Sequence, residues 1–267
     1  MSDSEYLFEN EAPEAGDRFD ALGALFDPVS LRHLDDLGVT SGWHCLDVGA
    51  GGGSVAIWLA ARVGSSGRVL ATDLDVRWLE HRLRAHHIEV RQHDIVHDDL
   101  PERSFDLVHE RLVLIHVRER IAALEHMVAA LRPGGWLLAE DFDSAFGTDL
   151  YVDQPSEDEA LGNRIMTSVR SLLAQRGADT ALGHRLPQLL REAGLEEVSA
   201  EGYQSIIGGN AARRLQRANI VQVADQLVEQ GLVARDELDR YLTALGEGTV
   251  SPRSALLVSA RGRRAQT

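Results

Sequence analysis

The sequence contains no lysine, since all 27 of its basic residues are arginine. Most pyridoxal-phosphate enzymes hold their cofactor through a lysine Schiff base, and Walker-type nucleotide sites bind phosphate with a lysine. The absence of lysine therefore excludes both kinds of site.

Cysteine is almost absent as well. Cys45 is the only cysteine among 267 residues, and it lies within a predicted core strand where we expect it to pack. A single cysteine excludes a disulfide bond within the chain and a thiolate metal cluster. The histidines and aspartates of "RQHDIVHDD" also lack the ordered spacing of metal ligands, so we expect no metal site.

Positive charge is scarce overall, because 42 acidic residues outnumber the 27 basic ones and give a formal net charge of -15. Such a field repels nucleic-acid backbones and anionic lipid surfaces. We therefore expect a small-molecule substrate, either neutral or cationic, and neither nucleic acid nor a membrane as a partner. A homodimer is compatible with the sequence.

Long apolar runs are also missing. No run in the sequence approaches the roughly 20 apolar residues that a bilayer-spanning helix needs. The first residues, "MSDSEYLFENEAPEAGD", are acidic, whereas a signal peptide begins with positive charge followed by an apolar segment. These two features predict a cytoplasmic protein.

Apolar segments with strand-like and helix-like spacing alternate through the first half of the chain. Alternation of this kind buries parallel strands between two layers of helices, so it predicts an α/β fold with a doubly wound, Rossmann-like sheet. Strands are predicted at residues 43–49, 68–73, 88–91, 106–109 and 136–141, and helices at 55–63, 76–86 and 118–131.

Helical patterns flank this alternating region. Before it, we expect a pair of helices that is broken at Pro28 and closed by Gly38. After it, Ser156 and Glu159 form a capping box at the start of an amphipathic helix. The remaining predicted elements are a helix ending at Gly194, a strand after it, helices at 211–230 and 236–245, and a last strand at 254–264.

We divide the chain into three parts and prefer one domain with helical insertions over two domains. Residues 1–40 form an N-terminal helical arm or flap, residues 41–145 the Rossmann-like core, and residues 146–267 complete the sheet and add the insertions. Parallel strands direct both insertions toward the edge of the sheet where ligands bind, so we expect a substrate lid. Their apolar faces indicate either an apolar acceptor pocket or ordinary core packing, and comprise Leu161, Ile165, Val169, Ile220, Val223 and Leu227.

The segment "LDVGAGGGS" places a glycine-rich loop between a predicted strand and a helix. Proteins of the α/β class use such loops to bring backbone amides against a nucleotide. A dinucleotide site would need glycine where this chain has Ser54. Asp47, just before the first glycine, would repel a pyrophosphate but attract a sulfonium or an ammonium group. The loop therefore favours S-adenosylmethionine over a nicotinamide dinucleotide.

Two further acids follow the next two predicted strands. Asp73, followed by Leu74, occupies the position where nucleotide-binding folds place a carboxylate on the ribose hydroxyls. Asp94 can accept a hydrogen bond from an adenine amino group while Ile95 covers the ring. Each acid alone is also explained as a helix cap or turn former. In this order behind a glycine loop, they indicate a ligand that contains adenosine.

Taken together, these motifs resemble those of class I S-adenosylmethionine-dependent methyltransferases that act on small molecules. The resemblance covers residues 40–145 and rests on "LDVGAGGGS", "VLATDLD", "QHDI", "FDLVHERLVLIHV" and "LRPGGWLLAEDFD". It implies S-adenosyl-L-methionine as cofactor and a seven-stranded sheet with an antiparallel last strand inserted beside the fifth. The cofactor-binding residues that it implies are Asp47, Gly49, Ala50, Gly51, Gly53, Asp73, Leu74, Asp94, Ile95 and Glu110.

Methyl transfer from a sulfonium is an in-line displacement, which mainly requires alignment of the acceptor and exclusion of water. Glu110 is a candidate catalytic residue because it follows the fourth strand and can polarise an acceptor hydroxyl; the alternative is a surface ion pair with Arg111 or Arg118. His116 is a second candidate, as general base; the alternative, which is the commoner role of a lone histidine in such a segment, is a packed residue.

The leading hypothesis is a methyltransferase of secondary metabolism that methylates a small molecule, with oxygen as the first expected acceptor atom and nitrogen or carbon left open. One alternative is an enzyme that binds S-adenosylmethionine but performs other chemistry, such as a cyclisation. A second is a non-catalytic cofactor-binding protein. A dehydrogenase is disfavoured by Ser54 and Asp47.

Overall fold

The computed structural model describes residues 7, 14–83 and 88–266. The chain forms two compact units, each assembled from separate segments. The sheet unit comprises Phe26–Phe142, Ala181–Tyr203 and Leu257–Thr267 as far as they are described. The helical unit comprises Met1–Leu25, Asp143–Thr180 and Gln204–Leu256, with the same restriction.

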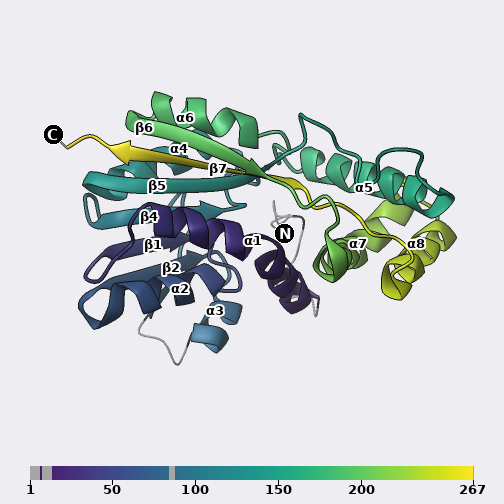
Figure 1. Cartoon of the computed structure of the whole chain (residues 1–267), viewed down its shortest axis with the longest axis horizontal. Helices are drawn as coiled ribbons and strands as arrows, with labels where there is room; N and C mark the ends of the chain where they lie inside the picture. The colour runs from purple at the N-terminus through teal and green to yellow at the C-terminus, as the bar shows by residue number, and fades with distance from the viewer. Residues whose placement is uncertain (1–6, 8–13, 84–87, 267) are drawn as a thin grey trace. The chain divides into compact units, whose positions relative to one another are not determined.

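Seven strands make up the sheet, in the order β3-β2-β1-β4-β5-β7-β6 (Figure 1). The pairs among β1 to β5 are parallel, whereas β7 runs antiparallel to β6. The predicted fold class is therefore confirmed, including the last strand inserted beside the fifth. The strands are β1 (His44–Val48), β2 (Arg68–Asp73), β3 (Ile88–Gln92), β4 (Phe105–Arg111), β5 (Leu131–Asp143), β6 (Leu195–Tyr203) and β7 (Leu256–Arg264).

Helices cover both faces of the sheet. Successive residues of a strand point to opposite sides, so each face of the sheet presents side chains for helices to pack against. In β1, Cys45 packs into a core with residues of α1, α2 and α3, while Leu46 packs on the other face with residues of α4 and α6. The predicted end of the third helix falls on residues 84–87, outside the described residues. The helices are α1 (Ala15–Asp36), α2 (Ser54–Val63), α3 (Arg77–Leu83), α4 (Arg120–Ala130) and α6 (Leu186–Glu192), with short 3-10 helices η1 (Gly64–Ser66) and η2 (Gly183–Arg185).

The predicted helix pair at the start of the chain is wrong, because α1 continues through Pro28. Proline inside a helix removes one backbone hydrogen bond and usually breaks or kinks the helix. Here Pro28 itself is exposed, while Phe26 and Leu34 are fully buried. Burial of these side chains offsets the lost hydrogen bond, which the sequence pattern alone does not reveal.

The "RPGG" segment lies within β5 and does not form a separate turn before it. Strand pairing shifts from Phe105 opposite Leu131 to Leu107 opposite Trp136, so the extra residues of β5 bulge out. Gly134, at a φ of 79°, takes the left-handed conformation that this bulge requires. The strand therefore starts earlier than its apolar pattern predicts.

The helical unit contains α5 (Glu157–Gln175), α7 (Gly209–Glu229) and α8 (Arg235–Glu247). The predicted capping box is confirmed: Glu159 N donates to Ser156 Oγ at 3.3 Å, and Ser156 N donates to Glu159 Oε2 at 2.8 Å. The six apolar residues of the predicted stripes on α5 and α7 are all buried in the core of this unit. Burial there favours ordinary core packing over an apolar acceptor pocket. The substrate lid and the division of the chain at residues 40 and 145 stay predictions.

Among the described residues, no helix combines the length and the hydrophobicity that crossing a membrane would require.

Candidate active site

The glycine loop connects β1 to α2 at the carboxyl end of the sheet. Gly49, Gly51 and Gly53 have φ angles of 62°, 51° and 79°, a region that other residues adopt only with strain. A Cβ atom on Gly49 would lie 2.3 Å from Cγ2 of Val113, so a side chain there would clash with the segment after β4. Glycine is therefore required both for the shape of the loop and for its close contact with a neighbouring segment.

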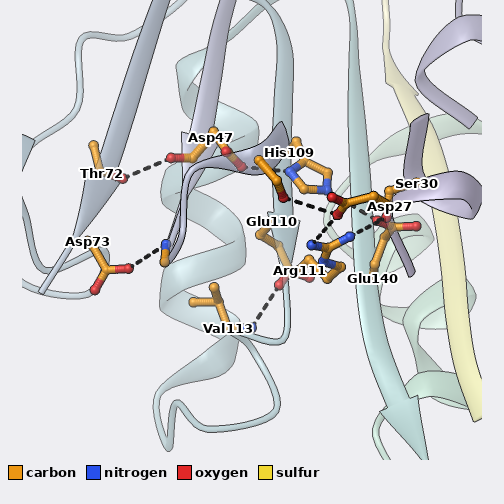
Figure 2. Close-up of polar contacts among 12 residues, drawn as sticks. Asp27, Ser30, Asp47, Thr72, Asp73, His109, Glu110, Arg111, Val113 and Glu140 are labelled. Carbon is orange, nitrogen blue, oxygen red and sulfur yellow. Dashed lines mark hydrogen bonds and ion pairs between the residues drawn. The ribbon is translucent and has the colours of Figure 1, made fainter. Parts of the chain in front are cut away.

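The end of β2 fixes this loop in place. Gly51 N donates to Asp73 Oδ2 at 2.9 Å (Figure 2). Ala50 N donates to Thr72 O, also at 2.9 Å. The other carboxylate oxygen of Asp73 accepts from Asp75 N at 3.1 Å. Burial raises the pKa of Asp73, and the backbone donors partly oppose this shift. Asp73 thus lies beside the loop where the sequence predicts it.

Asp47 and His109 form an ion pair inside the sheet unit. They lie opposite each other on β1 and β4, and His109 Nδ1 is 2.7 Å from Asp47 Oδ1 (Figure 2). His109 Nε2 lies 3.2 Å from Oε2 of Glu140 on β5. The two carboxylates outweigh the effect of complete burial and raise the pKa of His109 to about 9. One imidazolium therefore bridges two carboxylates across three neighbouring strands.

Glu140 is held in turn by two hydroxyl groups. Ser30 Oγ donates to its Oε2 and Ser259 Oγ to its Oε1, each at 2.5 Å. Although complete burial opposes ionisation, contact with His109 lowers the pKa of Glu140 to about 2. Glu140 therefore stays ionised and connects β5 to α1 and β7.

A second ion pair joins the end of β4 to the middle of α1. Arg111 Nη2 donates to Asp27 Oδ1 at 2.8 Å, and Arg111 Nη1 donates to Ser30 Oγ at 2.9 Å (Figure 2). Ser54 Oγ at the start of α2 also donates to Asp27 Oδ1, at 3.1 Å. Arg111 thus pairs with Asp27, so the alternative in which Arg111 pairs with Glu110 at the surface is wrong.

Glu110 is fully buried and lies on the opposite face of the sheet from His109. Its Oε2 accepts from Val113 N at 3.1 Å, and Asp141 Oδ1 on β5 accepts from Ile115 N at 3.2 Å. Burial raises the pKa of Glu110 to about 7, and burial together with the Glu110 carboxyl raises that of Asp141 well above its usual range. Two like charges cannot both be accommodated here, so the pair retains a proton near neutral pH.

The remaining predicted residues lie around the same edge. Leu74, directly after β2, has 59% of its surface exposed. Asp94 Oδ1 accepts from Val96 N at 2.9 Å and thus forms a turn. Ile95 is buried in the core. His116 is half-buried in the turn after β4. The geometry alone assigns none of them a role, so their roles stay predictions.

No cluster of histidine, cysteine or acidic side chains that could hold a metal occurs in the part of the chain that the structure describes. The sequence does not predict that His109 pairs with Asp47 and Glu140, nor that Ser30 and Ser259 bond to Glu140. The one feature of the sequence that indicates this cluster is the presence of polar residues within strands that are otherwise apolar. Which of these residues pair across strands cannot be read from one strand alone.

Part of the chain is similar to a known family of domains. Residues 46–139 match the model of a methyltransferase domain. The chain is 28% identical over 191 residues to phosphoethanolamine N-methyltransferase 3 of Arabidopsis thaliana, covering 70% of this chain but only about a third, 35%, of that protein.

Two solved structures share the fold. Phosphoethanolamine N-methyltransferase 2 of Haemonchus contortus matches with a TM-score of 0.62 at 16% identity, over 100% of this chain and 61% of that one. The [4+2]-cyclase SpnF matches with a TM-score of 0.56 at 16% identity, over 88% of this chain and 82% of that one. Both likenesses show the fold alone. The glycine loop, the ordered acids and the domain match identify residues 46–139 as a methyltransferase domain of the class I S-adenosylmethionine-dependent kind.

Proposed function

We propose that this chain transfers the methyl group of S-adenosylmethionine to a small-molecule acceptor. The observation that carries the proposal is the pair of acidic side chains, Asp47 and Asp73, beside a left-handed glycine loop at the carboxyl ends of β1 and β2. A negative site of this kind suits a sulfonium and an ammonium and opposes a pyrophosphate.

The residues present fit the cofactor. The buried Oδ2 atom of Asp47 has no hydrogen-bond partner within the described part of the chain, so it can accept from an ammonium group. Asp73, which bonds to the loop, is the residue assigned to the ribose in this proposal, and the exposed apolar side chain of Leu74 beside it can cover the adenine. When bound, the cofactor supplies an electrophilic methyl group on a sulfonium.

The chain's own residues then position the acceptor and receive its proton. Glu110 lies opposite Val48 in the register of β4 and β1, next to the start of the loop, and a carboxyl group with a pKa of about 7 is suited to proton transfer near neutrality. His116, in the turn that follows, is the second candidate base. The acidic pair of Glu110 and Asp141 offers a site for one proton and thus for either an amine or a hydroxyl acceptor.

The acceptor atom is the finer part of the proposal. The sequence motifs favour oxygen, since no amino-methylase motif of the kind used on DNA or protein follows the fourth strand. The name of the Arabidopsis relative supports nitrogen instead. We place the chain in secondary metabolism and propose a small acceptor of neutral or cationic charge, in keeping with the net charge of -15.

The test has two stages. Calorimetry should show binding of S-adenosylmethionine and no binding of NAD; the reverse result would favour a dehydrogenase instead. Purified protein is then incubated with S-adenosylmethionine and panels of small amines and hydroxyl compounds, and released S-adenosylhomocysteine is measured. Release that depends on one panel supports methyl transfer and identifies the acceptor atom.

The alternative of a different reaction on the same site is favoured by one observation, the shared fold with a [4+2]-cyclase. It would be supported if an acceptor were converted to product without release of S-adenosylhomocysteine. Cofactor binding without conversion of any compound would instead support the non-catalytic alternative.

A further inference from the structure

The two carboxylate oxygens of Asp47 differ in their hydrogen-bond partners. Its Oδ1 contacts His109, whereas its Oδ2 is buried and has no partner among the residues that the structure describes. The whole residue is 2% exposed, so bulk water does not replace the missing partner. A buried charged oxygen without a partner costs free energy, which a cationic ligand would recover.

The orientation of that oxygen depends on His109. Both ring nitrogens of His109 face carboxylates, Nδ1 at 2.7 Å from Asp47 and Nε2 at 3.2 Å from Glu140. A neutral imidazole has only one donor, so the geometry requires the doubly protonated ring. The ring cannot turn away, because Glu140 is itself fixed by Ser30 on α1 and Ser259 on β7.

The charges of this cluster leave a net negative site for the ligand. Asp47 and Glu140 contribute two negative charges and His109 one positive charge, and Glu140 has no oxygen left without a partner, since both accept hydroxyl hydrogens. The free oxygen of Asp47 is therefore the one carboxylate oxygen of this cluster that is left to accept from a ligand. His109 thus separates two carboxylates and orients one of them.

We propose that His109 is a positioning residue for the cofactor: it fixes Asp47 so that its free oxygen receives the ammonium group of the methionine portion. This inference rests on the proposed cofactor site. A merely structural role of His109 would affect binding of the whole ligand, whereas the proposed role affects only its methionine end. In the proposed function, the adenosine end contacts Asp73 on β2.

The experiment compares two ligands by calorimetry. S-adenosylhomocysteine carries the amino-acid portion, whereas 5′-methylthioadenosine has the same adenosyl thioether and no ammonium group. We expect His109→Gln to weaken S-adenosylhomocysteine binding by about 10-fold or more, the usual effect of disturbing a charged hydrogen bond. Binding of methylthioadenosine should stay within about twofold. His44→Gln, a change on β1 at a histidine that contacts Arg132, is the matched control and should alter neither affinity.

A double-mutant cycle tests whether His109 acts through Asp47. In an Asp47→Asn background, His109→Gln should cause little further loss of S-adenosylhomocysteine affinity, because the shared interaction has already been removed. Equal losses in both backgrounds would overturn the proposal. So would an equal loss for both ligands in the single variant, since this would indicate a general disturbance of the site.

A measurement on the wild-type protein does not depend on whether the variants fold. Nitrogen NMR of the histidine rings should show both nitrogens of His109 protonated, with Nδ1 shifting when S-adenosylhomocysteine is added but not with methylthioadenosine. An Nδ1 signal of His109 that is unchanged by S-adenosylhomocysteine would overturn the proposal. If the wild-type protein binds neither ligand, the proposed function itself fails, which this same series of titrations reveals first.

Discussion

The backbone amide of Gly51 donates a 2.9 Å hydrogen bond to Oδ2 of Asp73, which joins the glycine loop to the end of the neighbouring strand β2. The carboxylate thus shapes the loop, and in the proposed function it also binds the ribose hydroxyls of the adenosyl ligand. On that proposal, a single side chain couples the form of the loop to the affinity for the ligand.

Replacing Asp73 should weaken cofactor binding. Asn keeps an oxygen for Gly51 N but loses the negative charge, so Asp73→Asn should raise the Kd for S-adenosylmethionine by about 10- to 100-fold. Calorimetry measures this change. Asp75→Asn is the matched control because its carboxylate pairs with Arg77, and it should leave the Kd within about twofold. Equal effects of the two variants would remove the ribose role of Asp73.

Replacing Glu110 should change how stability depends on pH. The pKa of Glu110 is raised to about 7 in the folded chain, so the unfolded chain releases its proton at lower pH. Stability therefore falls as pH rises from about 4.5 to 7, by on the order of 3 kcal/mol for this group. Glu110→Gln resembles the protonated form at every pH, so its stability should not show this fall. In thermal melts, the stability of the variant minus that of the wild type should therefore be larger at pH 8 than at pH 5. A parallel profile for both proteins would contradict the assignment.

The same residue should affect turnover. If Glu110 accepts the proton of the acceptor, Glu110→Gln should lower kcat by at least about 10-fold, since general bases commonly contribute more than that. The Kd for S-adenosylmethionine should stay near its wild-type value. His116→Ala is assayed in parallel as the second candidate. If both variants keep near-normal turnover with intact cofactor binding, neither residue is the base.

The buried imidazolium predicts a different pH window. The charged groups facing His109 are Asp47 from β1 and Glu140 from β5, and they raise its pKa to about 9. Its contribution to stability is therefore complete below about pH 6.5 and is lost as pH rises through 9. His109→Gln should be less stable than the wild type by about 3 kcal/mol at pH 6, with the difference shrinking by pH 10. Urea unfolding at both pH values measures it, and a constant difference would rule out a charged His109.

The contact between Gly49 and Val113 can be tested with two alanine variants. Gly49→Ala places a Cβ 2.3 Å from Val113 at a φ of 62°, whereas Gly38→Ala has a φ of 80° and no atom within 4 Å. Both variants bear the cost of a left-handed backbone, about 1 kcal/mol, but only Gly49→Ala adds a clash. The free energy of unfolding should therefore fall further for Gly49→Ala by about 1–3 kcal/mol, as denaturant unfolding would show.

Much of the sheet could be predicted from the sequence, because apolar spacing and glycine positions report local structure directly. The bounds of β2 agree with the prediction, and the other strands of the alternating region differ mainly at their ends. The continuous helix through Pro28 could not be predicted, since tertiary burial of Phe26 and Leu34 outweighs the local preference of proline.

The candidate site was predictable only in part. The sequence order predicted that Asp47 and Asp73 would flank a glycine loop, because each follows a strand in a fixed topology. It could not predict that His109 lies between Asp47 and Glu140, since this depends on the register of three strands that are distant in the chain. The buried acidic pair of Glu110 and Asp141 was missed for the same reason.

The insertion of β7 between β5 and β6 has a consequence for the order of folding. During synthesis β6 emerges before its only neighbour in the sheet, so it has no partner until the segment up to Arg264 has left the ribosome. Ser259, which holds Glu140, arrives with that same segment. The nascent chain can therefore pair β1 to β5 early. The polar cluster around His109 is completed only later, when β7 pairs with β5 and β6.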